Sequence, residues 1–137
     1  MGREFFDTRK NIVDVSAAKT LLPSDSGSVF MINQASAYDI ALPAASDAQR
    51  GWNAEFILGT ADSNAVTISA TTGDGDNIHG HSIDGEDAAQ TVTEGTGVDV
   101  ITFASGATKG DRVSLMCDGV SYYVFGLAAD KVHITLT

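Results

Sequence analysis

Apolar and polar residues alternate along most of this chain, and helical periodicity is almost absent. The clearest alternation runs from Trp52 to Leu58, where every second residue is apolar. Because successive side chains of a strand point to opposite faces of a sheet, a period of two predicts a strand with one buried face. The same period recurs at 66–69, 112–117 and 132–137. The pattern therefore predicts an all-β protein.

Shorter runs extend this set of strands. Residues 28–32 form a continuous apolar run rich in β-formers, which predicts a strand buried on both faces. The pair Asp118-Gly119 separates the run that ends at Cys117 from the run at 121–125, and this dipeptide is typical of a β-hairpin. Further strands are predicted at 20–22, 38–42, 91–93 and 98–104.

Helical composition occurs only at 43–50, where Pro43 starts the segment and Gly51 follows it, which predicts one or two helical turns. About nine or ten short strands at this spacing indicate a β-sandwich or a jelly-roll-like fold. A length of 137 residues suits a single domain. We therefore predict a sandwich over residues 20–137, preceded by a short N-terminal arm at 1–19.

The charge is divided unevenly between these two parts. The chain holds 18 acidic and 8 basic residues, a net charge of -10. Residues 1–19 contain four basic and three acidic residues, so the arm is slightly positive and the rest of the chain carries all of the excess negative charge. Such a body repels phosphate backbones, so no nucleic-acid partner is expected. No apolar run approaches the roughly 18 residues of a membrane span, so no membrane partner is expected either.

The arm places two aromatic side chains beside basic ones, a combination that anchors well on a partner surface. The candidate binding residues are Arg3, Phe5, Phe6, Arg9 and Lys10. Two structural alternatives remain open at this stage. The arm is equally consistent with a frayed terminus, and with a first strand packed on its own domain.

Residues 71–96 read as a long polar loop region with one short strand inside it, rich in glycine and acidic residues. An EF-hand counted from Asp74 fails, because Ile78 stands at the fifth position and Gly85 at the twelfth. A looser calcium loop would use Asp84, Glu86 and Asp87.

The same region contains His79 and His81, which would share one face of a strand and are weak candidates for a metal. One copy of the pair needs a third ligand, and three copies meeting on an axis would supply a full set. Our prediction remains no metal and no cofactor.

No motif for nucleophilic catalysis is present in the sequence, so we expect no enzymatic activity. The single cysteine, Cys117, is in phase with Val113 and Leu115 and is predicted to be a buried small hydrophobe. Trp52 is in phase with apolar neighbours and is predicted to be core. Of Tyr122 and Tyr123, which point to opposite faces, at least one is expected inside.

The order of strands and turns resembles a known module. The segments that carry the similarity are 26–32 (SGSVFMI), 40–43 (IALP), 55–58 (EFIL), 64–68 (NAVTI), 76–80 (DNIHG) and 118–124 (DGVSYYV). Their order is similar to that of the small β-sandwich module of tailed-phage virion proteins, which occurs in head decoration (cement) proteins and in tail-fibre domains. The similarity covers about residues 20–127, and its motifs are short and generic.

A module that stands nearly alone behind a short arm resembles a decoration protein more than a tail fibre. The resemblance implies a non-enzymatic structural protein of the virion, assembled in the host cytoplasm, that stabilises the capsid as a homotrimer on its outer surface. Its partner would be the major capsid protein, contacted by the five arm residues. The alternative is a tail-fibre or receptor-binding module that recognises host surface polysaccharide through an exposed aromatic shelf including Trp52.

Overall fold

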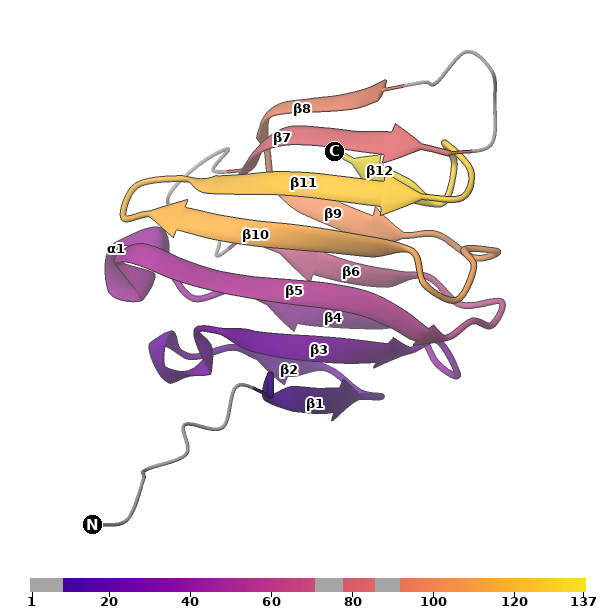
Figure 1. The fold of residues 1–137 in the computed structure, drawn as a ribbon, viewed down its shortest axis with the longest axis horizontal. Coiled ribbons are helices and arrows are strands. Elements are labelled where there is room, and N and C mark those ends of the chain that lie inside the picture. The colour runs from indigo at the N-terminus through magenta and orange to yellow at the C-terminus, as the bar shows by residue number, and fades with distance from the viewer. Residues whose placement is uncertain (1–8, 71–77, 86–91) are drawn as a thin grey trace, which may run out of the picture.

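Two β-sheets pack face to face in the computed structural model, which describes residues 9–70, 78–85 and 92–137 (Figure 1). The front sheet has seven strands, in the spatial order β1 (Ile12–Val15), β3 (Ser28–Asn33), β5 (Arg50–Thr60), β10 (Arg112–Asp118), β11 (Tyr122–Ala128), β7 (Ile78–Asp84) and β8 (Val92–Val98). The rear sheet has five, in the order β12 (Ile134–Leu136), β9 (Val100–Phe103), β6 (Val66–Ser69), β4 (Tyr38–Ala41) and β2 (Lys19–Thr20).

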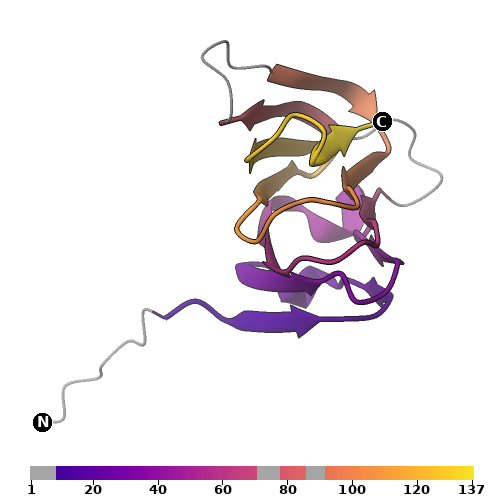
Figure 2. The same ribbon diagram turned by 90° about the vertical axis from the view of Figure 1, so that its right-hand side faces the viewer.

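The first six strands alternate between the two sheets, so each strand pairs in parallel with the strand two places earlier in the chain. This gives the parallel pairs β1–β3 and β3–β5 in the front sheet, and β2–β4 and β4–β6 in the rear sheet. Antiparallel pairing appears mainly in the second half, for example between β10 and β11. Figure 2 shows the stack from the N-terminal strands at one end to β7 and β8 at the other.

The core lies between the sheets and is built from the inward residues of the alternating strands. Phe30 and Phe56 stack with their ring centroids 5.2 Å apart. Trp52 and Tyr122 meet edge to face at 5.8 Å, and the Tyr122 hydroxyl donates a 2.6 Å hydrogen bond to the carbonyl oxygen of Pro43. Burial of these large rings, together with the aliphatic side chains packed around them, supplies the driving force for folding.

The structure confirms the predicted all-β sandwich and most of its strands. The short helix α1 (Ala45–Ala48) lies within the predicted helical segment, and a 3-10 turn (Pro23–Asp25) precedes β3. Trp52, Cys117 and Tyr122 are buried, as predicted from their phase. The sheets are mixed, whereas a jelly roll is built from antiparallel Greek keys, so the sandwich is the accurate description.

One region differs from the sequence-based expectation. Residues 78–84 and 92–98, which were expected to be mostly loop, form the antiparallel pair β7–β8. Residues 12–15 lie in the front sheet as its edge strand, parallel to β3, which for this part of residues 1–19 is the alternative of a first strand packed on its own domain. Within the described ranges, no helix is long and apolar enough to cross a membrane.

Candidate functional site

The outer surfaces of the two sheets differ in chemistry. Across the rear sheet, Thr135, Thr102, Thr67 and Asp39 stand opposite one another on β12, β9, β6 and β4. The hydroxyls of Thr67 and Ser69 each donate a 2.6 Å hydrogen bond to the Asp39 carboxylate. This polar surface is what a sheet face in contact with water normally presents.

The front sheet instead carries a row of apolar side chains on its outer surface, which we call the apolar row. Strand register aligns its five members across the sheet: Met31 on β3, Ile57 on β5, Leu127 on β11, Ile83 on β7 and Val92 on β8. Arg112 on β10 stands between Ile57 and Leu127. Leu127 and Val92 are 47% and 52% exposed. The row crosses six neighbouring strands, a width of about 24 Å at the usual strand spacing.

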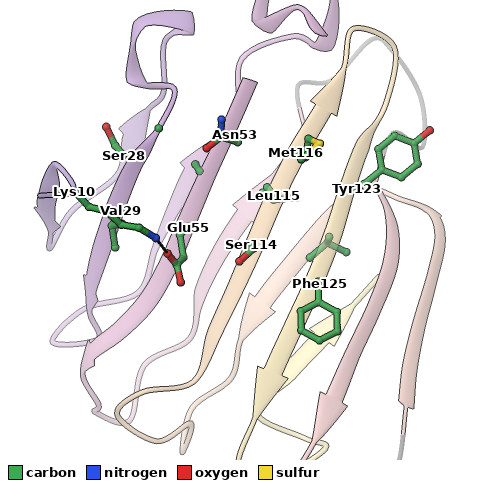
Figure 3. A pocket seen from close by; sticks show the side chains of 13 residues that line it. Lys10, Ser28, Val29, Asn53, Glu55, Ser114, Leu115, Met116, Tyr123 and Phe125 are labelled. Atoms are coloured by element: carbon green, nitrogen blue, oxygen red, sulfur yellow. Dashed lines mark hydrogen bonds and ion pairs between the residues drawn. The ribbon is translucent and has the colours of Figure 1, made fainter. Parts of the chain in front are cut away.

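Beside the apolar row, the same outer surface is hollowed into a groove of about 500 Å³. Met116, Tyr123 and Phe125 stand on one side, and Lys10 and Val29 on the other (Figure 3). The surface is hollow in between because the outward residues of β5 and β10 that line it include the small or short side chains Asn53 and Ser114, and because Gly27 has none. Met116, Tyr123 and Phe125 are each about half exposed, at 59%, 49% and 56%.

Charge at the groove is largely neutralised internally. The Lys10 ammonium lies 3.0 Å from Glu55 Oε2, reaching across β3 as Figure 3 shows, and Arg112 lies 3.9 Å from the other Glu55 oxygen. A side chain exposed as much as that of Lys10 contributes little stability through such a pair. The chain at residue 10 is placed beside the groove by the backbone, because the neighbouring Asn11 carbonyl oxygen accepts a hydrogen bond from the Val29 N–H.

The hydroxyl of Tyr123 is fixed at one end of the groove by the β10–β11 turn. It donates a 3.0 Å hydrogen bond to Asp118, whose carboxylate also accepts hydrogen bonds from the backbone N–H groups of Val120 and Ser121. The N–H donors of Ser121 and Val120 lower the pKa of Asp118. In turn, the hydrogen bond to this carboxylate raises the pKa of Tyr123, so the phenol stays neutral.

The candidate metal residues His79 and His81 both lie on β7. They point to the outer face of the sheet, as Ile83 does, and so share one face as the HxH spacing predicts. His79 Nδ1 accepts a hydrogen bond from the Gly97 N–H, and its ring lies 6.1 Å from that of Tyr123. Among the described residues no group of three His, Cys, Asp or Glu side chains could hold a metal ion. Of the candidate calcium ligands, Asp84 is buried on β7, and Asp74, Glu86 and Asp87 lie outside the described residues.

Of the five predicted arm residues, some are described by the structure and some are not. Arg3, Phe5 and Phe6 lie outside the described residues. Arg9 is exposed, and Lys10 lines the groove as described above. Lys10 therefore lies at the described groove, and its contact with a partner stays a prediction; Met116, Tyr123 and Phe125 were not among the predicted binding residues of the arm.

The missed residues carried a usable signal. Tyr123, Phe125 and Leu127 alternate with Tyr122 and Val124, so both faces of β11 are apolar. This pattern predicts a strand covered on both sides, by the same reasoning that applies to residues 28–32. In residues 28–32 the prediction holds at Val29, which is only 4% exposed although it faces outward into the groove, and only in part at Met31, which is half-buried.

Cys117 gives a direct check on the packing behind this surface. The thiol is 1% exposed and its burial raises the pKa of the thiol. We expect no reaction with a thiol-specific disulfide reagent in native buffer, and one equivalent of reaction in denaturant, because attack needs an accessible thiolate. The release of the reagent's chromophore over time measures this. Rapid native reaction would contradict the packing of β10 against α1.

Compared with protein-family models, with curated proteins and with solved structures, the chain shows no significant match to any of them.

Proposed function

We propose that this protein is a non-enzymatic structural protein of a phage virion, which decorates the capsid by docking the outer face of its front sheet on major capsid protein subunits. The apolar row is the observation that carries the proposal. Leu127 and Val92 would lose about half of their surface from water on docking, and a row of outward apolar side chains interrupted only by Arg112 favours an interaction site.

The difference in polarity between the outer surfaces of the two sheets supports docking through the front sheet. The rear sheet presents threonines and a hydrogen-bonded aspartate, so it suits the solvent side of a displayed protein. On the described strands of the front sheet, the outward carboxylates are those of Asp14, Glu55, Glu94 and Asp118, a small part of the 18 acidic residues in the chain. Depletion of charge at the centre of a surface is typical of protein interfaces.

The choice of a capsid as the partner rests on the resemblance of the strand and turn segments to phage decoration modules. A homotrimer is part of this proposal, because decoration proteins of that kind assemble around threefold positions. Acidic residues directed away from the shell would keep many closely spaced copies soluble.

The proposal is tested by counting copies in purified virus particles from the source of this sequence, using mass spectrometry calibrated against the major capsid protein. Decoration predicts a copy number of the same order as the number of capsid threefold sites. A handful of copies would indicate a tail component. Absence from the particles would contradict both assignments.

The role of the apolar row is tested with Leu127→Ser combined with Val92→Ser. Both side chains are half exposed, so folding should change little, whereas loss of two interface anchors should weaken particle binding at least about tenfold. The matched control is Thr102→Ser with Thr135→Ser on the rear sheet, which should leave binding unchanged. Equal binding by both double variants would remove the front face from the proposal.

Recognition of polysaccharide is the second candidate, favoured by the exposed pair Tyr123 and Phe125 beside the groove. For this candidate, Trp52 was expected to belong to an exposed aromatic shelf, but it is 2% exposed. Its indole N–H donates a hydrogen bond to the Leu22 carbonyl oxygen within the protein. Binding on a glycan array that is lost on Tyr123→Ala, with no binding to particles, would favour this candidate over decoration.

A further inference from the structure

We propose that the groove on the front sheet is the docking site of the chain's own N-terminal segment, residues 2–8, with Phe5 and Phe6 as the side chains that enter it. The apolar row lies outside the groove lining, so this inference does not depend on the capsid partner.

The path of the chain brings the segment to the groove. Ile12 stands opposite Val29 in the parallel pair β1–β3, so Lys10, two residues earlier, lies beside Gly27. Lys10 and Gly27 both line the groove, and the space above Gly27 is open, since a Cβ placed there would meet no atom within 4 Å. The pairing of β1 with β3, extended by the hydrogen bond from the Val29 N–H to the Asn11 carbonyl oxygen, fixes the point from which the preceding residues must start.

The length of the segment matches the width of the groove. From β1 the sheet runs through β3 and β5 to β10, which is three strand spacings or about 14 Å. The five residues from Lys10 back to Phe5 span at most about 17 Å when extended. Phe5 and Phe6 can therefore reach the hollow over Ser114 without any change in the described sheet.

The lining suits aromatic side chains. Met116, Tyr123 and Phe125 form an apolar wall of one sulfur-containing and two aromatic side chains, and Val29 lies on the opposite side. Methionine sulfur and aromatic rings make favourable contacts with a further ring. Phe5 and Phe6 are the only apolar side chains of residues 2–8, which are Gly, Arg, Glu, Phe, Phe, Asp and Thr.

The tether favours the segment of the same chain over that of a second copy. Lys10 lines the groove next to the paired strand β1, so residues 2–8 are presented at an effective concentration that reaches the millimolar range for short linkers. A second copy at micromolar concentration would compete poorly with it.

Methionine methyl groups report on this contact. The chain has three methionines; Met116 lines the groove, and Met31 lies on the same sheet face in the apolar row, outside the lining. In protein labelled with ¹³C at the methionine methyls, the variant Phe5→Ala/Phe6→Ala should shift the Met116 resonance by removing ring-current effects. The Met31 resonance should stay in place and report that the fold is intact.

A control and two further measurements complete the test. Glu4→Gln/Asp7→Asn, which keeps both rings, should leave Met116 unchanged. In the wild-type protein, nuclear Overhauser contacts should join the Met116 methyl to a phenylalanine ring whose signals disappear in Phe5→Ala/Phe6→Ala. An unchanged Met116 resonance in that variant would overturn the proposal. Recovery of the wild-type resonance after unlabelled wild-type protein is added would also overturn it, because the rings would then come from a second copy.

Discussion

Gly80→Ala is expected to lower the free energy of unfolding by about 3–5 kcal/mol, more than any surface substitution in this protein. Gly80 lies on β7 beside Val124 of the parallel strand β11, and its φ is +142°, a region that favours glycine. A Cβ at this position would overlap the carbonyl oxygen of Val124, which is backbone and can move only if the two strands separate. The measurement is the midpoint and slope of urea unfolding.

A second glycine separates the two causes of the lost stability at Gly80, which are the positive φ and the overlap with the Val124 carbonyl oxygen. Gly106 also has a positive φ, +97°, but a Cβ there would meet nothing within 4 Å. Gly106→Ala should therefore lose only the conformational part, about 1–2 kcal/mol. If Gly80→Ala were no more destabilising than Gly106→Ala, the close approach of β7 and β11 would be wrong.

The same close approach explains why β7 was not predicted as a strand. Its inward positions after Ile78 are Gly80, Ser82 and Asp84, so the strand shows almost no apolar alternation. The two strands approach closely at Gly80 and Gly126: a Cβ on Gly80 would overlap the Val124 carbonyl oxygen, and a Cβ on Gly126 would meet the Ser82 hydroxyl at 2.7 Å. Pattern analysis detects strands through apolar burial, and β7 belongs to the sheet through backbone pairing and small size instead.

Strands whose inner face fills the core were predictable, because their alternation follows directly from burial. In β5 and β10 every inward residue from Trp52 to Leu58 and from Val113 to Cys117 is buried. Their partners were not predictable in the same way. Alternation reports which face is buried but not which strand lies next, so the parallel pairing of β1, β3 and β5 leaves no local signal.

The candidate site depends on that missing information. The apolar row exists only because register aligns Met31, Ile57, Leu127, Ile83 and Val92, which come from five different strands. Each of them, taken alone, is an unremarkable outward apolar residue. Lys10 was singled out from composition, whereas its place beside Glu55 required the fold.

Asp111→Ala is expected to lower the free energy of unfolding by about 3 kcal/mol, the second large effect. The Asp111 carboxylate is 4% exposed and accepts hydrogen bonds from the Thr108 N–H, the Thr108 hydroxyl and the Ala129 N–H, at 2.8, 3.1 and 2.9 Å. These bonds tie the loop before β10 to the turn after β11. His133 Nδ1 lies 2.9 Å from the same carboxylate but makes no hydrogen bond of good geometry with the described residues, so we assign the stabilisation to the three donors.

The matched control for this prediction is Asp39→Ala on the rear sheet. Asp39 also accepts two hydrogen bonds, from the hydroxyls of Thr67 and Ser69, but it is only half-buried and its donors can turn to water when the carboxylate is removed. The expected loss there is about 1 kcal/mol, because an exchange with water replaces most of the bond energy. Urea unfolding of both variants under the same conditions makes the comparison. If Asp111→Ala cost no more than Asp39→Ala, the donors at Thr108 and Ala129 would also have access to water, and the carboxylate would not be what holds the two turns together.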